Sequence, residues 1–118
     1  MYKISKQFHF SASHQLLALP EDHPCARMHG HNYIVEIVLE SETLNQYGFV
    51  LDYSDLDKLK EFIDSKLDHR HLNDVLGDDF TTAENLAKYL YDWAKLQWSE
   101  VTAVRVSETP KTWAEYVP

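Results

Sequence analysis

Residues His29–Leu39, which read HGHNYIVEIVL, contain the strongest strand signal of the chain and the first pair of candidate metal ligands. The part Tyr33–Leu39 is rich in β-branched side chains, which predicts a β-strand. His29 and His31 stand at i and i+2, so an extended backbone places both imidazoles on the same side. Gly30 between them lets that backbone pack closely against a neighbour.

A second strand is predicted upstream of this stretch. In Ile4–His14 an alternation with a period of two places Phe8, Phe10 and His14 on one face. Residues 16–28 follow neither a strand period nor a helix period and contain two prolines, so we expect a loop there.

Two helices are predicted downstream, after a turn at Gly48. The first has apolar residues at helical spacing behind polar residues suited to capping: Leu56, Leu59 and Ile63 follow Asp52, Ser54 and Asp55. Thr81 and Glu84 have the spacing of a capping box, which predicts the start of the second helix. This helix is the longer of the two. Its mostly apolar stripe comprises Ala83, Leu86, Leu90, Trp93 and Gln97.

The last part of the chain predicts two more strands, Val101–Thr109 and a short one near Trp113–Val117. Glu108 shares the parity of Val104 and Val106, so an acid stands on an apolar face, where desolvation is unfavourable unless something binds it. The order β-β-α-α-β indicates an α+β fold with an antiparallel sheet. Two helices cover only one face of such a sheet, so we expect a homo-oligomer that covers the rest.

The composition restricts the class of protein. With 118 residues, of which 44% are hydrophobic, we expect a single domain over residues 1–118. A net charge of -8 with dispersed lysines and arginines argues against nucleic-acid binding. We see no signal peptide and no run near the ~18 apolar residues of a membrane span, so we expect a cytoplasmic protein without a membrane partner. Cys25 is the only cysteine, so no internal disulfide can form.

Three histidines form the first candidate site. His14, His29 and His31 together would offer three neutral nitrogens and leave a fourth tetrahedral position open, the pattern of a catalytic zinc site. The alternative is a chance His-x-His pair in a loop, because metal motifs are weak predictors when the ligands are far apart in sequence.

Four further residues carry possible chemistry. Cys25 is close enough along the chain to reach the same pocket as His29, where a thiolate would act as base or nucleophile, but an inert buried cysteine is the alternative. Asp68 beside His69 would orient the ring for proton transfer, with surface capping as the alternative. Glu108 either binds a ligand or forms a salt bridge, for example to Lys111.

Five motifs in order complete the analysis: residues 10–14 (FSASH), 25–33 (CARMHGHNY), 67–69 (LDH), 82–86 (TAENL) and 107–110 (SETP). Together they resemble the 6-pyruvoyl-tetrahydropterin synthase superfamily over nearly the whole chain, and most closely its 6-carboxy-tetrahydropterin synthases of queuosine biosynthesis. The resemblance implies the tunnelling fold (T-fold), with a four-stranded antiparallel sheet and two helices on one face. Three subunits would close a barrel and two trimers would stack into a homohexamer, with active sites between subunits.

The resemblance also implies roles for the candidate residues. His14, His29 and His31 would bind zinc, and Glu108 would anchor the pterin through its 2-amino group and ring N–H. Cys25 would be the general base, and Asp68 with His69 the second proton-transfer unit. The implied lyase reaction converts 7,8-dihydroneopterin triphosphate to 6-carboxy-5,6,7,8-tetrahydropterin, acetaldehyde and triphosphate.

Two alternatives remain at this point. The pyruvoyl-forming enzymes eliminate triphosphate from the same substrate but keep its side chain, and the short spacing from Cys25 to His29 resembles the carboxy-forming branch instead. The second alternative is a non-catalytic zinc or pterin-binding module, which would not need Cys25, Asp68 or His69. The chain departs from the family pattern at Phe80 and His71. Arg27 and Arg70, beside the motifs, are candidates for holding the triphosphate.

Overall fold

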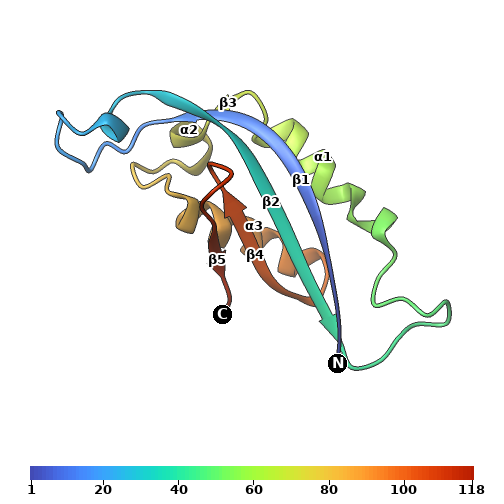
Figure 1. Cartoon of the computed structure of the whole chain (residues 1–118). Coiled ribbons are helices and arrows are strands. Elements are labelled where there is room, and N and C mark those ends of the chain that lie inside the picture. The colour runs from blue at the N-terminus through green and yellow to red at the C-terminus, as the bar shows by residue number, and fades with distance from the viewer.

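The computed structural model describes residues 1–118, which form one five-stranded sheet backed by helices (Figure 1). The strands are β1 (Tyr2–His14), β2 (His29–Ser41), β3 (Arg70–His71), β4 (Val101–Ser107) and β5 (Ala114–Tyr116). Their order across the sheet is β3-β1-β2-β4-β5. β1 and β2 pair antiparallel along their whole length, so the two longest strands form a hairpin at the centre of the sheet.

Helices cover one face of this sheet. They are α1 (Asp57–Lys66), which follows a 3-10 turn at Tyr53–Leu56, α2 (Leu72–Leu76) and α3 (Ala83–Gln97). The alternation of β1 and β2 turns their apolar side chains toward α1 and α3, where they are removed from water. This core includes Phe8, Phe10, Val35, Ile37, Leu59, Ile63, Leu86 and Leu90. The predicted α+β class is therefore confirmed, with both long helices on one face.

The sheet contains one more strand than the four expected. The two-residue strand β3 runs parallel to β1, opposite Ala12 and Ser13, so the sheet is mixed and not purely antiparallel. The five-residue helix α2 follows directly and ends at Gly77, which adopts the left-handed conformation that favours glycine (φ 64°). Neither element was predicted, because each is too short to show a period.

The cap of α3 differs by one residue from the prediction. Thr82, not Thr81, is the N-cap, and its hydroxyl accepts a hydrogen bond from the N–H of Asn85 at 3.3 Å. Thr81 is fully buried instead and contacts His14, as described below. The predicted capping box from Thr81 to Glu84 is therefore wrong, although the helix begins where expected.

The opposite face of the sheet has no covering helix and carries many polar side chains. Glu36 lies there in a row across the strands, where it accepts hydrogen bonds from Gln7 and Arg105, each at 3.0 Å. Partial burial acts to raise the pKa of Glu36, but the two hydrogen bonds and the charge of Arg105 outweigh it and hold the pKa below its usual range. Arg105 also packs over the ring of Trp113, 4.6 Å from its centroid.

No helix of the protein combines the length and the apolar character that a membrane crossing requires.

Candidate active site

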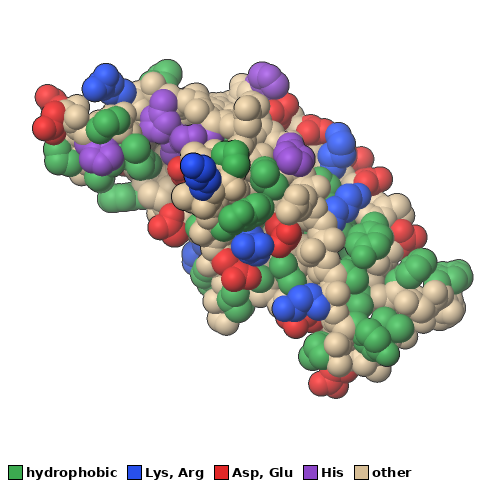
Figure 2. Space-filling model, in the orientation of Figure 1, with side chains coloured by type: hydrophobic (Ala, Val, Ile, Leu, Met, Phe, Trp, Pro, Cys, Tyr) green, Lys and Arg blue, Asp and Glu red, His purple; other side chains and the backbone are tan.

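The hairpin brings the three predicted metal ligands together. His14 ends β1 and lies directly opposite His29, the first residue of β2, and His31 follows on the same face. One nitrogen from each ring lies within 4.8 Å of the others. Figure 2 shows histidine side chains gathered toward the end of the molecule that carries the β1–β2 loop. The antiparallel register therefore joins residues that the loop separates in sequence.

Hydrogen bonds fix the tautomers of two of these rings. Nδ1 of His14 lies 2.8 Å from the carbonyl oxygen of Thr81, and Nδ1 of His29 lies 2.7 Å from that of Arg27. A carbonyl oxygen only accepts, so each Nδ1 carries the proton and each neutral ring keeps a lone pair on Nε2. Such second contacts are typical of metal-binding histidines.

The free nitrogens converge as a cation would require. Nε2 of His14 and Nε2 of His29 are only 3.0 Å apart, so two lone pairs face each other. Nε2 of His31 is buried and has no hydrogen-bond partner. Unpaired buried polar atoms and opposed lone pairs are both unfavourable, and a bound metal ion relieves both. The three side chains therefore fit a metal ion.

Burial also keeps His14 and His31 in the state that binds a metal. Desolvation lowers the pKa of His14 and of His31, and the negative charge of Glu108 opposes this only in part. Neutral imidazole is the form that coordinates a metal, since a protonated ring has no lone pair to donate.

Glu108 lies beside the cluster, just beyond the end of β4. Its Oε2 is 3.7 Å from Nε2 of His31, beyond hydrogen-bond distance, and the predicted alternative of a salt bridge to Lys111 is not formed. Tyr33 is a residue of this region that the sequence analysis missed. Its hydroxyl is buried without a partner, and burial, followed by the charge of Glu108, raises the pKa of Tyr33. Its parity with His29 and His31 on β2 was the available signal.

Asp68 and His69 form the pair that the sequence suggested. Oδ2 of Asp68 lies 2.9 Å from Nδ1 of His69, and Oδ1 accepts a hydrogen bond from the N–H of Ser11 at 2.9 Å. These contacts, the Ser11 hydrogen bond foremost, hold the pKa of Asp68 below its usual range. His69 has a φ of 58°, which is uncommon for a residue with a side chain, and its N–H donates to the carbonyl of Ser11 at 2.6 Å.

A hollow of about 590 Å³ lies beside this pair, on the face of the sheet that carries Ser11, Ser13 and Asn32. It lies along the ends of β1 and β2 and its lining includes both His31 and His69. His71 also lines it, with Nδ1 2.9 Å from the hydroxyl of Ser13, so this histidine is not a free surface imidazole. Arg70 is part of the wall, but its guanidinium donates to the carbonyl of Ser65.

Cys25 makes no side-chain hydrogen bond or ion pair with any other predicted site residue. It is partly exposed in the 3-10 turn Pro24–Ala26 of the β1–β2 loop, where its carbonyl accepts a hydrogen bond from the N–H of Leu16. It belongs neither to the histidine cluster nor to the hollow next to His69. Within one chain the structure therefore gathers the three histidines with Glu108 nearby, and separately pairs Asp68 with His69. Cys25 belongs to neither group.

We predict that Asp68→Asn destabilises the protein at pH 7 and that its difference from wild type narrows toward pH 3. A carboxyl whose pKa is lowered on folding stabilises the native state above its unfolded value, about 3.9, and this contribution is lost as the pH falls through the folded value. Urea unfolding at both pH values measures the effect. Asp64→Asn, which breaks an exposed pair with Lys60, is the control and should change stability little. A pH-independent difference for Asp68→Asn would contradict the prediction.

Fold and site together define an α+β protein with three histidines placed to hold a metal ion at the end of a hairpin. A family model described as 6-pyruvoyl tetrahydropterin synthase matches residues 3–118. The chain therefore belongs to the 6-pyruvoyl tetrahydropterin synthase family.

Individual relatives agree with this assignment. The chain is 35% identical over 124 residues to a 6-carboxy-5,6,7,8-tetrahydropterin synthase of Synechocystis sp., with 98% of this chain and 93% of the relative covered. It is 37% identical over 95 residues to a 6-pyruvoyl tetrahydrobiopterin synthase of Dictyostelium discoideum, with 70% of each covered. The solved 6-pyruvoyl tetrahydropterin synthase of Caenorhabditis elegans superposes with a TM-score of 0.87 at 27% identity, covering 99% of this chain and 95% of that chain.

Proposed function

We propose that the protein is a zinc-dependent 6-carboxy-5,6,7,8-tetrahydropterin synthase, which converts 7,8-dihydroneopterin triphosphate to the carboxy-pterin, acetaldehyde and triphosphate for queuosine biosynthesis. The observation that carries the proposal is the convergence of three histidine nitrogens beside Glu108. Several 6-carboxy-5,6,7,8-tetrahydropterin synthases are similar to the chain over nearly its whole length, including those of Synechocystis sp. and Bacillus subtilis.

The metal would be held by His14, His29 and His31, with the fourth position left for the substrate. A zinc ion bound there supplies a Lewis acid toward the oxygens of the substrate side chain. The carbonyls of Thr81 and Arg27 keep Nε2 of His14 and His29 free of protons, so both ligands stay ready to coordinate.

Glu108 would orient the substrate. Its carboxylate accepts two hydrogen bonds from the 2-amino group and the ring N–H of a pterin, and charge-assisted bonds of this kind offset the cost of its burial. The hydroxyl of Tyr33 is buried without a hydrogen-bond partner, and the charge of Glu108 acts on it. This hydroxyl would supply a hydrogen-bond donor for this part of the site. The carboxylate next to His31 thereby holds the pterin side chain toward the three histidines.

Proton transfer would use His69 and Cys25. Asp68 binds Nδ1 of His69, which leaves Nε2 directed away from Asp68 for exchange with the substrate. The thiolate of Cys25 would act as the general base and take a proton from the substrate. Because no hydrogen bond or ion pair joins His69 to Cys25 or to the histidine cluster in one chain, we infer that the complete site forms between subunits of a homo-oligomer, a trimer or a dimer of trimers.

A second candidate function is that of the pyruvoyl-forming enzymes, because the solved structure from Caenorhabditis elegans has the same fold over 99% of this chain. The two activities share their substrate and differ in whether a carbon–carbon bond of the side chain is cleaved. Only the carboxy-forming reaction releases acetaldehyde.

We expect zinc-loaded protein incubated with dihydroneopterin triphosphate to form 6-carboxy-tetrahydropterin and an equal amount of acetaldehyde. Mass spectrometry identifies the pterin, and an enzymatic assay measures acetaldehyde in the same sample. A pyruvoyl product without acetaldehyde would assign the protein to the second function. No turnover by protein with stoichiometric zinc would exclude both and favour a non-catalytic zinc or pterin-binding module.

A further inference from the structure

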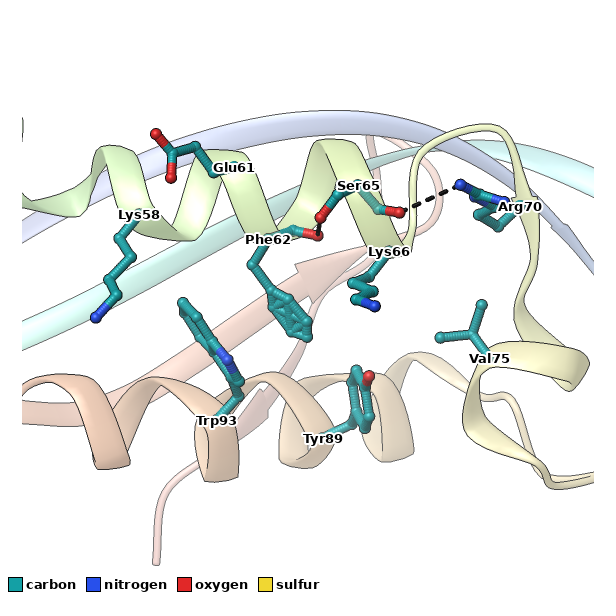
Figure 3. Close-up of a pocket in the computed structure, with 9 residues that line it drawn as sticks. All are labelled: Lys58, Glu61, Phe62, Ser65, Lys66, Arg70, Val75, Tyr89 and Trp93. Atoms are coloured by element: carbon teal, nitrogen blue, oxygen red, sulfur yellow. Dashed lines mark hydrogen bonds between the residues drawn. The ribbon is translucent and has the colours of Figure 1, made fainter.

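A groove lies between α1 and α3, in the helical layer (Figure 3). It has a volume of about 780 Å³ and is open to solvent along its length. None of the three histidine ligands, Glu108, Asp68 or His69 lines it. Its chemistry is therefore not accounted for by the proposed reaction.

Aromatic rings form the floor of this groove. Phe62 of α1 faces Trp93 of α3 with 4.4 Å between ring centroids, and Tyr89 lies 6.1 Å from Phe62. Tyr89 and Trp93 stand at i and i+4, so they occupy one face of α3 and point toward α1 in Figure 3. All three rings are partly exposed, so they offer flat apolar surface to a planar ligand.

Cations stand at both ends of this aromatic floor. Lys58 and Lys66 flank Phe62 at i-4 and i+4 on α1, which separates them by about 12 Å along the helix axis. Arg70 lies beyond the same end of α1 as Lys66, where its guanidinium donates a hydrogen bond to the carbonyl of Ser65 (Figure 3). None of these three takes part in a salt bridge, whereas Lys60 on the same helix is paired with Asp64. Glu61 is the one carboxylate in the lining, and Figure 3 shows it directed away from the rings.

This distribution of charge is unusual for so acidic a chain. Its net charge is -8, yet the groove presents three cations against one acid. Cations outside salt bridges and beside partly exposed aromatic rings are the groups that recognise a planar ring carrying phosphates: the rings stack and the cations bind the phosphate oxygens. An uncharged apolar ligand would leave the cations unused, and inorganic phosphate alone would leave the rings unused.

We propose that the groove is a second binding site, which takes a heteroaromatic polyphosphate of the nucleoside triphosphate class. The ring lies against Trp93 and Phe62, and the phosphates reach Lys66 and Arg70 at one end of the groove. Lys58, at the other end, adds positive charge beside the ring. The site is separate from the metal cluster and binds its ligand without chemistry.

ATP is the probe, because adenine lacks the adjacent amino and ring N–H donors that Glu108 is proposed to hold. Calorimetric titration of the metal-loaded wild-type chain with ATP at low salt is compared with the variant Lys58→Glu/Lys66→Glu. We expect ATP affinity to fall at least about tenfold in this variant. Lys60→Glu is the matched control, since it makes the same charge change on α1 outside the groove, and it should shift the affinity less than about twofold.

Three results would overturn the proposal. The first is no detectable ATP binding by the wild type, and the second is an equal loss in Lys60→Glu, which would show only long-range electrostatics. The third is tripolyphosphate binding as tightly as ATP, which would show that the rings contribute nothing. All variants change exposed side chains, and circular dichroism checks their folding. Because binding is measured without turnover, failure here is distinct from failure of the proposed enzymatic function.

Discussion

His31→Ala is expected to lower zinc affinity at least about 100-fold and to abolish turnover. Nε2 of His31 is buried without a hydrogen-bond partner, so a bound metal ion is the group that would satisfy its lone pair. Removal leaves two nitrogens, those of His14 and His29, which is one fewer than catalytic zinc sites use. Competition with a chromogenic chelator measures affinity, and elemental analysis measures bound metal.

His9→Ala is the matched control, because His9 belongs to the same hairpin but is exposed on the polar face of the sheet, opposite Ile34. It should leave zinc affinity unchanged. If His31→Ala bound zinc as tightly as His9→Ala, the cluster would not be the metal site, and the mechanism proposed above would lose its Lewis acid.

Cys25→Ala is expected to keep one zinc per chain and to reduce turnover by about 10²–10⁴-fold, the range that a positioned general base contributes. Metal content should persist because Cys25 is not part of the cluster of His14, His29 and His31. Turnover should fall because alanine has no group that takes a proton. Steady-state rates and metal content are measured on the same preparation.

Two other results for Cys25→Ala would contradict this prediction, and each would assign a different role to the thiol. Loss of zinc in Cys25→Ala would make the thiol a fourth ligand and the site a closed, structural one. Full turnover with full zinc would remove Cys25 from the mechanism and leave His69 as the proton-transfer group on this chain.

Sequence patterns predicted the elements that repeat over many residues. The alternation of Ile4–His14 and the helical spacing from Leu56 to Ile63 each repeat often enough to reveal which face is buried. β3 and α2 depend on tertiary contacts instead. The N–H of His69 donates to the carbonyl of Ser11 and turns the chain onto the edge of β1, which no local period encodes.

The residues of the candidate site also divide into those that the sequence predicts and those that depend on tertiary contacts. His14, His29 and His31 were predictable because side-chain type decides metal binding. Thr81 was not, since the group that holds Nδ1 of His14 is a backbone carbonyl that any residue supplies. The position of Cys25 relative to His69 depends on the path of the long loop between β1 and β2, and no sequence pattern predicts that path.

The pairing of His14 with His29 has a consequence for biosynthesis of the protein. All three imidazoles have left the ribosome once the first hairpin has emerged, but Thr81, which fixes the tautomer of His14, is made 67 residues after it. A nascent hairpin therefore carries every ligand atom without the carbonyl that prepares the first of them. We therefore expect the newborn chain to hold a metal less tightly until the segment with Thr81 docks on His14, which would make metal loading a late step of folding.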